Sequence, residues 1–222
     1  MPSELELLTE EIIDCRKCPR LVEWREQVAR EKRASFRDWD YWGRPITGLG
    51  DPDAELLVVG LAPAAHGGNR TGRVFTGDRS GDWLFRALHR AGCANQPEST
   101  HRDDGLHLTG AYVTAVVRCA PPANKPATVE RDNCIPYLER EVELLPNVRV
   151  IVPLGGFAYQ NVARLFAVKP RPAFGHGVEV TIDDRRKIVC SYHPSQQNTF
   201  TRRLTEEMLD SVFTRARQLA SR

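Results

Sequence analysis

The sequence predicts a three-layer α/β/α fold with a central, mostly parallel sheet, in a single domain of residues 1–222. Short continuous apolar runs, of which Leu56 to Val59 is the clearest, are typical of strands buried on both faces. These runs alternate with amphipathic stretches of helical length, the order found in α/β proteins. No internal repeat or interdomain linker divides the chain.

The residues before the first expected strand are predicted to form mainly helices and a loop. Ser3 and Glu6 form a capping box at the start of a helix that ends near Cys15. A second amphipathic stretch covers residues 21–32, so residues 3–33 are expected to be largely helical. Residues 36–51 are rich in aromatic residues and interrupted by glycine and proline, which predicts a loop.

The rest of the chain alternates between strands and helices. The expected strands are residues 56–59, 112–117 and 148–152, followed by a hairpin of 178–182 and 187–192. The expected helices are residues 81–91, 128–145 and 157–168, with a long C-terminal helix after the loop 193–198. In a parallel sheet, ligands bind beyond the carboxyl ends of the strands. The site is therefore expected in loops 60–77, 118–127 and 193–198.

Composition excludes several classes of protein. With 41% hydrophobic and 27% charged residues, the chain is neither disordered nor fibrous. No apolar run approaches the roughly 18 residues of a membrane span, and the acidic N-terminus does not resemble a secretory signal. A cytoplasmic, prokaryotic protein without a membrane partner is expected. The net charge of +2 does not indicate nucleic-acid binding, which would require a local basic patch.

The six cysteines fall into two groups. Cys93 and Cys190 lie in apolar surroundings and are expected to be buried thiols. Cys15 and Cys18 form a CxxC pair, which supplies half of a metal shell, and Cys119 and Cys134 could supply the rest. Such a site would attach the N-terminal helices to the loop 118–134. A redox dithiol is the alternative for the first pair, and spacing does not separate zinc from an iron–sulfur cluster.

The glycine-rich loop after the first strand has an unusual composition. It matches neither a Walker loop nor a dinucleotide-binding fingerprint, so an ordinary anion-binding loop is the simpler interpretation. However, Phe75 and Asp78 stand beside Arg70 and Arg73. This combination offers a ring on which a base can stack, a carboxylate and cations for phosphates.

The segment from Tyr192 to Asn198 leaves the last strand and enters a helix. A lone histidine is more often structural than catalytic, so His193 gains meaning only if it shares a site with the glycine-rich loop. Ser195 and Asn198 could cap the helix or contact a phosphate, and capping is the simpler explanation.

Three motifs together resemble the family-5 (type B) uracil-DNA glycosylases. Gly60-Leu-Ala-Pro with Asn69-Arg-Thr-Gly-Arg and Phe75-Thr-Gly-Asp78 is similar to their first motif, and His193-Pro-Ser-Gln-Gln-Asn198 is similar to their second. Residues 117–126 match the segment between the two. The likeness extends over about residues 10 to 220.

The resemblance implies a four-stranded parallel sheet and hydrolysis of the N-glycosidic bond of uracil in DNA, as the first step of base excision repair. It also implies a structural [4Fe–4S] cluster on Cys15, Cys18, Cys119 and Cys134. By position, the implied catalytic residues are Asp78, Asn124 and His193. The implied substrate contacts are Gly60, Leu61, Ala62 and Phe75. The implied contacts to damaged double- or single-stranded DNA are Arg70, Arg73, Pro194, Ser195, Asn198 and Arg202.

The sequence departs from the family pattern at three positions. Ala64 replaces a common glycine, and Leu61 and Ala115 stand where related families have polar residues that read the base. These losses favour looser base discrimination, with hypoxanthine and xanthine as further candidate substrates.

Two alternatives to this function remain open. One is a non-catalytic, metal-stapled module that binds nucleic acid through arginines. The other is an enzyme that acts on mononucleotides. The arginines that the nucleic-acid-binding module would use are Arg70, Arg73, Arg118, Arg202 and Arg203.

A monomer is expected, because nothing in the sequence indicates an oligomer.

Overall fold

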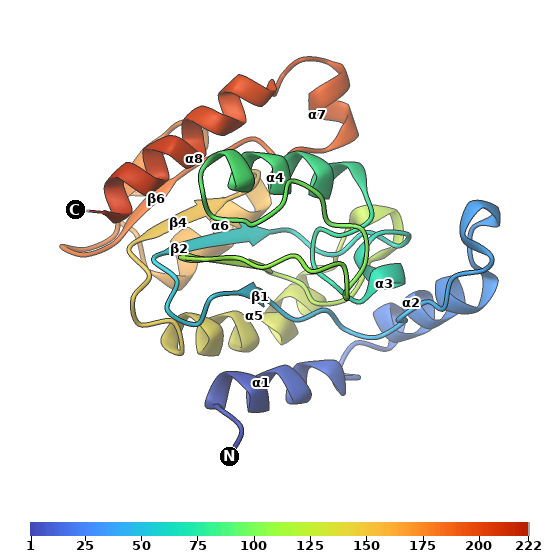
Figure 1. The fold of residues 1–222 in the computed structure, drawn as a ribbon. Helices are drawn as coiled ribbons and strands as arrows, with labels where there is room; N and C mark the ends of the chain where they lie inside the picture. The colour runs from blue at the N-terminus through green and yellow to red at the C-terminus, as the bar shows by residue number, and fades with distance from the viewer. Residues whose placement is uncertain (222) are drawn as a thin grey trace.

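A mixed, six-stranded sheet forms the centre of the computed structural model, which describes residues 1–221 (Figure 1). The strand order is β1-β3-β2-β4-β6-β5. The strands are β1 (Leu49–Gly50), β2 (Leu56–Gly60), β3 (Ala111–Ala115), β4 (Val150–Pro153), β5 (Glu179–Thr181) and β6 (Lys187–Val189).

The four inner strands β3, β2, β4 and β6 are parallel, as the sequence predicts, and the two outer strands are antiparallel. The observed sheet therefore has two strands more than the four that were expected, and both additional strands lie at its edges. Strand β1 lies in the segment that was expected to be a loop, and its two residues are too few for a recognisable periodicity. The predicted hairpin supplies both β5 and β6.

Complete burial explains why the central strands read as continuous apolar runs. Every residue of β2, β3 and β4 is buried. Val58 of β2 pairs with Val113 of β3 on one side and with Val152 of β4 on the other, so β2 has no free edge. Helices cover both faces, which leaves no position for a polar side chain without an internal partner.

The helices divide between the two faces of the sheet. Figure 1 shows α4 and α8 on one face, and α5 with α1 on the other. Leu84 of α4 and Phe213 of α8 belong to the first core, whereas Leu138 of α5 and Val162 of α6 belong to the second. The helices are α1 (Glu4–Ile13), α2 (Pro19–Glu31), α3 (Gly68–Thr71), α4 (Arg79–Arg90), α5 (Thr128–Glu143), α6 (Gly156–Leu165), α7 (Gln196–Phe200) and α8 (Glu206–Ala220). Two short 3-10 turns are η1 (Ala34–Phe36) and η2 (Pro122–Asn124).

The predicted capping box at Ser3 and Glu6 is confirmed, and α1 packs on α5 through a small apolar cluster. The C-terminal region differs from the prediction. A short helix, α7, is followed by a turn at residues 201–205, and α8 then starts after Thr205, whose side chain accepts a hydrogen bond from Met208 N at 3.2 Å. Arg202 and Arg203 lie in this turn and not in a long helix.

A buried ion pair connects β3 and its following loop to α5. Arg118 and Glu141 are each only 2% exposed, and Arg118 Nη2 lies 2.6 Å from Glu141 Oε2. Thr114 Oγ1 donates to the same carboxylate oxygen at 2.7 Å. Arg118 is therefore unavailable to bind nucleic acid, contrary to its place in the binding-module hypothesis. Among residues 1–221, no helix is long and apolar enough to cross a bilayer.

Candidate active site

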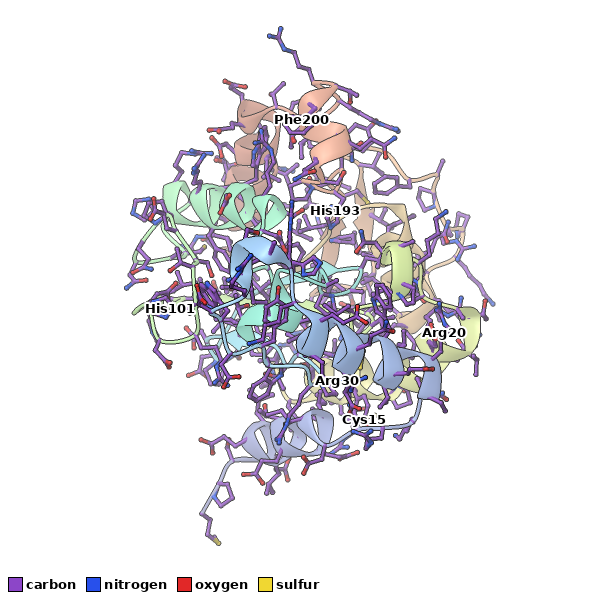
Figure 2. The ribbon with its side chains drawn as sticks, turned by 90° about the vertical axis from the view of Figure 1, so that its right-hand side faces the viewer. Cys15, Arg20, Arg30, His101, His193 and Phe200 are labelled. Carbon is purple, nitrogen blue, oxygen red and sulfur yellow. The ribbon has the colours of Figure 1, made fainter. Side chains whose placement is uncertain are left out.

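A cleft of about 570 Å³ opens at the carboxyl end of the parallel strands. Loops after β2, β3 and β6 all contribute to it, as the topology of a parallel sheet requires. Figure 2 looks onto this side of the molecule and shows His193 near its upper centre. Of the residues expected in the site, those that line the cleft are Leu61, Ala62, Phe75, Asp78, Asn124, His193 and Ser195.

Phe75 is held in place by glycine. Its backbone adopts a positive φ of 49°, and its ring lies against Gly60 at the end of β2. A Cβ atom at Gly60 would approach Phe75 Cζ to 2.5 Å, so only glycine leaves room for the ring. Gly60 is therefore placed to shape the cleft through Phe75, and Leu61 and Ala62 continue the wall beyond it.

Asp78 is the N-cap of α4, and its Oδ1 accepts a hydrogen bond from Gly81 N at 3.1 Å. Burial raises the pKa of the Asp78 carboxyl, and the nearby backbone N–H groups and Arg70 only partly offset that effect. The helix N-terminus nevertheless favours an anion at this position. A single carboxylate thus faces the cleft with a pKa tuned above its ordinary range.

His193 also lines the cleft, in the loop that follows the last parallel strand, β6. Burial lowers the pKa of His193 to about 4, so the ring is neutral at neutral pH. A Cβ atom added at Gly155, whose φ is 92°, would approach the Cβ of His193 to 3.2 Å, so glycine lets these two segments pack closely. A neutral imidazole can donate one hydrogen bond to an acceptor in the cleft without bringing a full charge.

Asn124 reaches the cleft from the loop between β3 and α5. Both Ala123 and Asn124 have positive φ values, 52° and 56°. Asparagine tolerates this left-handed conformation better than most residues. Its amide is exposed on the rim, where it can reach a ligand.

Arg70 and Arg73 do not take the places expected of them. Both side chains are buried, at 3% and 6% exposure, and most of their polar atoms have partners within the protein, although Arg70 Nη1 has no hydrogen-bond partner among the described residues. Arg73 pairs with Asp104 at 2.6 Å, and Arg70 donates to the backbone oxygens of His66 and Gly77. This arrangement gives no support to the prediction that the two arginines contact DNA phosphates, because both guanidinium groups are buried and bonded to groups of the protein itself.

The loop after His193 has mainly internal hydrogen bonds. Ser195 caps α7 by accepting from Asn198 N at 3.3 Å, and the Asn198 side chain donates to His193 O at 2.8 Å. Capping, the simpler explanation, is confirmed. Pro194 is buried and so offers little surface to DNA, which differs from expectation. Arg202 is exposed, as a phosphate contact would require.

Two residues at or beside the cleft were not predicted from the sequence. Arg79 lines the cleft beside Asp78, and its guanidinium lies 4.5 Å from the ring of Phe200. Phe200 is 65% exposed, an unusual state for a phenylalanine. The sequence signal available for Arg79 was its position next to Asp78, whereas Phe200 had no signal, because the sequence predicts a long helix where the structure has the short α7.

The second constellation is a cavity to which all four expected cysteines contribute. Cys15 and Cys18 are half-buried, Cys119 and Cys134 are buried, and none of them forms a disulfide. The cavity lies between the α1–α2 connection and the start of α5. Cys93 and Cys190 are buried elsewhere in the core, as predicted.

The surroundings of these thiols suit a metal–sulfur group. Arg25 Nη1 donates to Cys119 Sγ at 3.1 Å, and Asn133 Nδ2 donates to Cys18 Sγ at 3.4 Å. Such donors stabilise thiolate ligands and tune their electronics. Burial raises the pKa of Cys119 to about 12 and that of Cys134 to about 11, so binding of a metal group would displace protons. Within residues 1–221, no three such ligands converge closely enough for one metal ion.

Comparison with known proteins identifies the family. The fold and the cleft define the class of protein: an α/β protein with a polar site at the carboxyl edge of its parallel strands. The model of the "Uracil DNA glycosylase superfamily" matches residues 47–217. The chain belongs to this superfamily, and its relatives place it in the type-5 group.

Three of these relatives cover most of the chain. A "Type-5 uracil-DNA glycosylase" of Mycobacterium tuberculosis is 54% identical over 93% of this chain and 78% of its own length. The protein of the same name from Thermus thermophilus is 50% identical over 97% of this chain and 98% of its own length. That from Pyrobaculum aerophilum is 45% identical over 92% of this chain and 88% of its own length. The resemblance inferred from the motifs is confirmed.

Proposed function

We propose that this protein hydrolyses the N-glycosidic bond of uracil in DNA and so initiates base excision repair. The observation that supports this best is the meeting of Phe75, Asp78, Asn124 and His193 in one cleft. They come from separate loops and supply a stacking ring, a carboxylate, an amide and an imidazole. Family membership points to the same activity.

The substrate base must leave the double helix before it can enter the cleft. Extrusion costs a few kcal/mol and is cheapest for a mispaired base, which contributes to selectivity. Phe75 would stack on the extruded base, with Leu61 and Ala62 lining its edge. Leu61 and Ala115 offer no polar group to read uracil specifically, so we include hypoxanthine and xanthine in the proposed substrate range.

Asp78 would act on the attacking water. The water oxygen bonds to C1′ of the sugar while the C1′–N bond breaks, and the bonding electron pair leaves with the base as an anion. Asp78 holds the water, stabilises the positive charge that develops on the sugar and accepts the water's proton. Its raised pKa makes it a better proton acceptor than an ordinary aspartate.

His193 and Asn124 would complete the site from the other walls. Neutral His193 donates a hydrogen bond to the base oxygen on which negative charge develops. Asn124 assists at the water or the sugar from the rim. Ser195, Asn198 and Arg202 belong to the loop and turn that would approach the DNA backbone.

We propose that Cys15, Cys18, Cys119 and Cys134 hold a [4Fe–4S] cluster with a structural role. The cluster would join residues 3–33 to the loop and helix that follow β3, and no step of hydrolysis is assigned to it. The fit rests on four thiols around one cavity with N–H donors to two of them. Iron and acid-labile sulfide analysis of the purified protein tests this, and a colourless zinc protein would contradict it.

An assay on a uracil-containing duplex, scored by alkaline strand cleavage, tests the activity. Strand breaks that depend on uracil and appear only after alkali support a monofunctional glycosylase. Binding without base release would instead support the non-catalytic module. Base release from mononucleotides but not from a duplex would support the small-molecule enzyme.

A further inference from the structure

The site does not account for a basic segment that begins in the last turn of α2 and ends before β1. Residues 30–44 hold five basic and three acidic residues. Arg30, Arg33 and Arg37 are exposed, and none of them pairs with a carboxylate in the part of the chain that the structure describes. Their charges are thus available to a ligand.

The segment is firmly attached to the glycine-rich loop through Arg70. The Arg70 guanidinium lies between the rings of Phe36 and Trp39, 3.9 Å and 4.0 Å from their centroids. Cation–π contacts of this kind are stabilising when they are sheltered from water. Arg70 therefore anchors the segment to the loop that holds Phe75 and Asp78.

Further hydrogen bonds fix the same attachment. Tyr41 Oη and His66 Nδ1 lie 3.0 Å apart, and Trp42 N donates to Arg70 O at 3.0 Å. Gly43 N donates to Asn69 O at 3.1 Å. An exposed segment held by this many contacts presents its arginines in a defined place, which lowers the entropic cost of binding.

The position of the segment suits an extended ligand that crosses the cleft. Figure 1 shows the segment after α2 and helix α7 on the side of the molecule to which β2 points. Figure 2, which looks at that side, shows Arg30 and Phe200 on opposite sides of His193. The exposed Arg79, Arg202 and Arg203 belong to the α7 side.

We propose that residues 30–44 form a second phosphate-binding surface that grips the DNA backbone opposite α7. The inference rests on the proposed function, because it assumes a DNA substrate in the cleft. A duplex bound with one nucleotide in the cleft extends beyond it on both sides, and each flank carries closely spaced phosphates. The basic excess and the exposed guanidinium groups match this ligand, and guanidinium binds phosphate in a bidentate manner. Asp38 and Asp40 reduce the positive charge of residues 30–44, which nevertheless remain net positive.

The test measures how binding depends on salt. The triple variant Arg30→Gln, Arg33→Gln, Arg37→Gln is compared with the unmodified protein on an undamaged duplex, over a series of salt concentrations. Each lost phosphate contact should reduce the slope of log K against log salt by about 0.9, so a reduction of about 2 to 3 is expected. The KM for a uracil duplex should rise in parallel.

Two controls sharpen the result. Arg149, Arg164 and Arg185 are exposed, away from the cleft, and their triple substitution by glutamine removes the same charge with no change in slope expected. Asp38→Asn with Asp40→Asn should strengthen binding. Equal slopes in the first triple variant and the unmodified protein, or equal losses in both triple variants, would overturn the inference. If the unmodified protein releases no uracil from DNA, the proposed function itself fails.

Discussion

The ring of Phe75 lies against the imidazole of His193, with centroids 6.0 Å apart and planes inclined by 33°. These two residues are far apart in the sequence, and they meet because β2 and β6 run in the same direction on either side of β4. The proposed stacking ring and the proposed hydrogen-bond donor are therefore neighbours in the lining of the cleft. An extruded base that enters the cleft would meet both groups.

Asp78→Asn should lose most of its turnover while it retains DNA binding. The amide cannot accept a proton and stabilises positive charge poorly, but it keeps the shape of the carboxyl. A loss of about 10²-fold or more in single-turnover rate is expected, as for removal of a general base. Binding of an undamaged duplex gives the comparison, and equal loss of binding and rate would contradict the assigned role.

The pH dependence of kcat/KM should show one acidic limb, set by Asp78. Its carboxylate form is the active one, so activity is lost as pH falls through a pKa that burial has raised above 3.8. His193, with its pKa lowered to about 4, stays neutral above that range and should add no limb near the ordinary histidine value. A limb close to pH 6.5 that disappears in His193→Gln would contradict this assignment.

Gly60→Ala should impair base release by displacing Phe75. The new methyl group would lie 2.5 Å from the ring, so the ring must leave its place in the cleft. We expect a reduced rate on uracil duplex with little change in affinity for undamaged DNA. Gly156→Ala is the matched control, because its Cβ would meet only ordinary contacts at 3.5 Å. Normal activity in Gly60→Ala would show that the position of Phe75 is unimportant.

Glu141→Gln should destabilise the fold, because it leaves the buried guanidinium of Arg118 without its counter-charge. Breaking a buried pair costs roughly 3–5 kcal/mol in the free energy of unfolding. Chemical denaturation of the two proteins, purified in the same way, measures this change. Glu11→Gln removes one partner of the exposed pair with Arg140 and should change stability by less than about 1 kcal/mol. Similar effects of the two substitutions would argue against the importance of burial.

The sequence predicted much of the architecture because local patterns report local structure. The run at residues 56–59 gave β2, and the capping box at Ser3 gave the start of α1. The two-residue strand β1 and the break between α7 and α8 escaped prediction. A strand this short is defined by its partner Val113 and has no periodicity of its own.

Prediction of the site was uneven for a related reason. Motif strings placed Phe75, Asp78, Asn124 and His193 correctly in one cleft, because loops at the carboxyl edge of a parallel sheet must converge. The same motifs predicted a DNA phosphate as the partner of Arg70, but its guanidinium packs against two aromatic rings of another segment and donates to two backbone oxygens of its own loop. The amino-acid sequence records which charged residues are present, but not which groups pair with them in the folded protein.

The sequence by itself determined the order of the buried inner strands along the chain, the capped start of α1 and the chemical groups available to the site. Only the tertiary structure decided which charges reach solvent and which cysteines share a cavity. Cys15 and Cys119 are brought together by the packing of α2 beside the loop after β3, and Arg73 is neutralised by Asp104. Burial and charge pairing depend on contacts between residues far apart in the chain, which local periodicity does not encode.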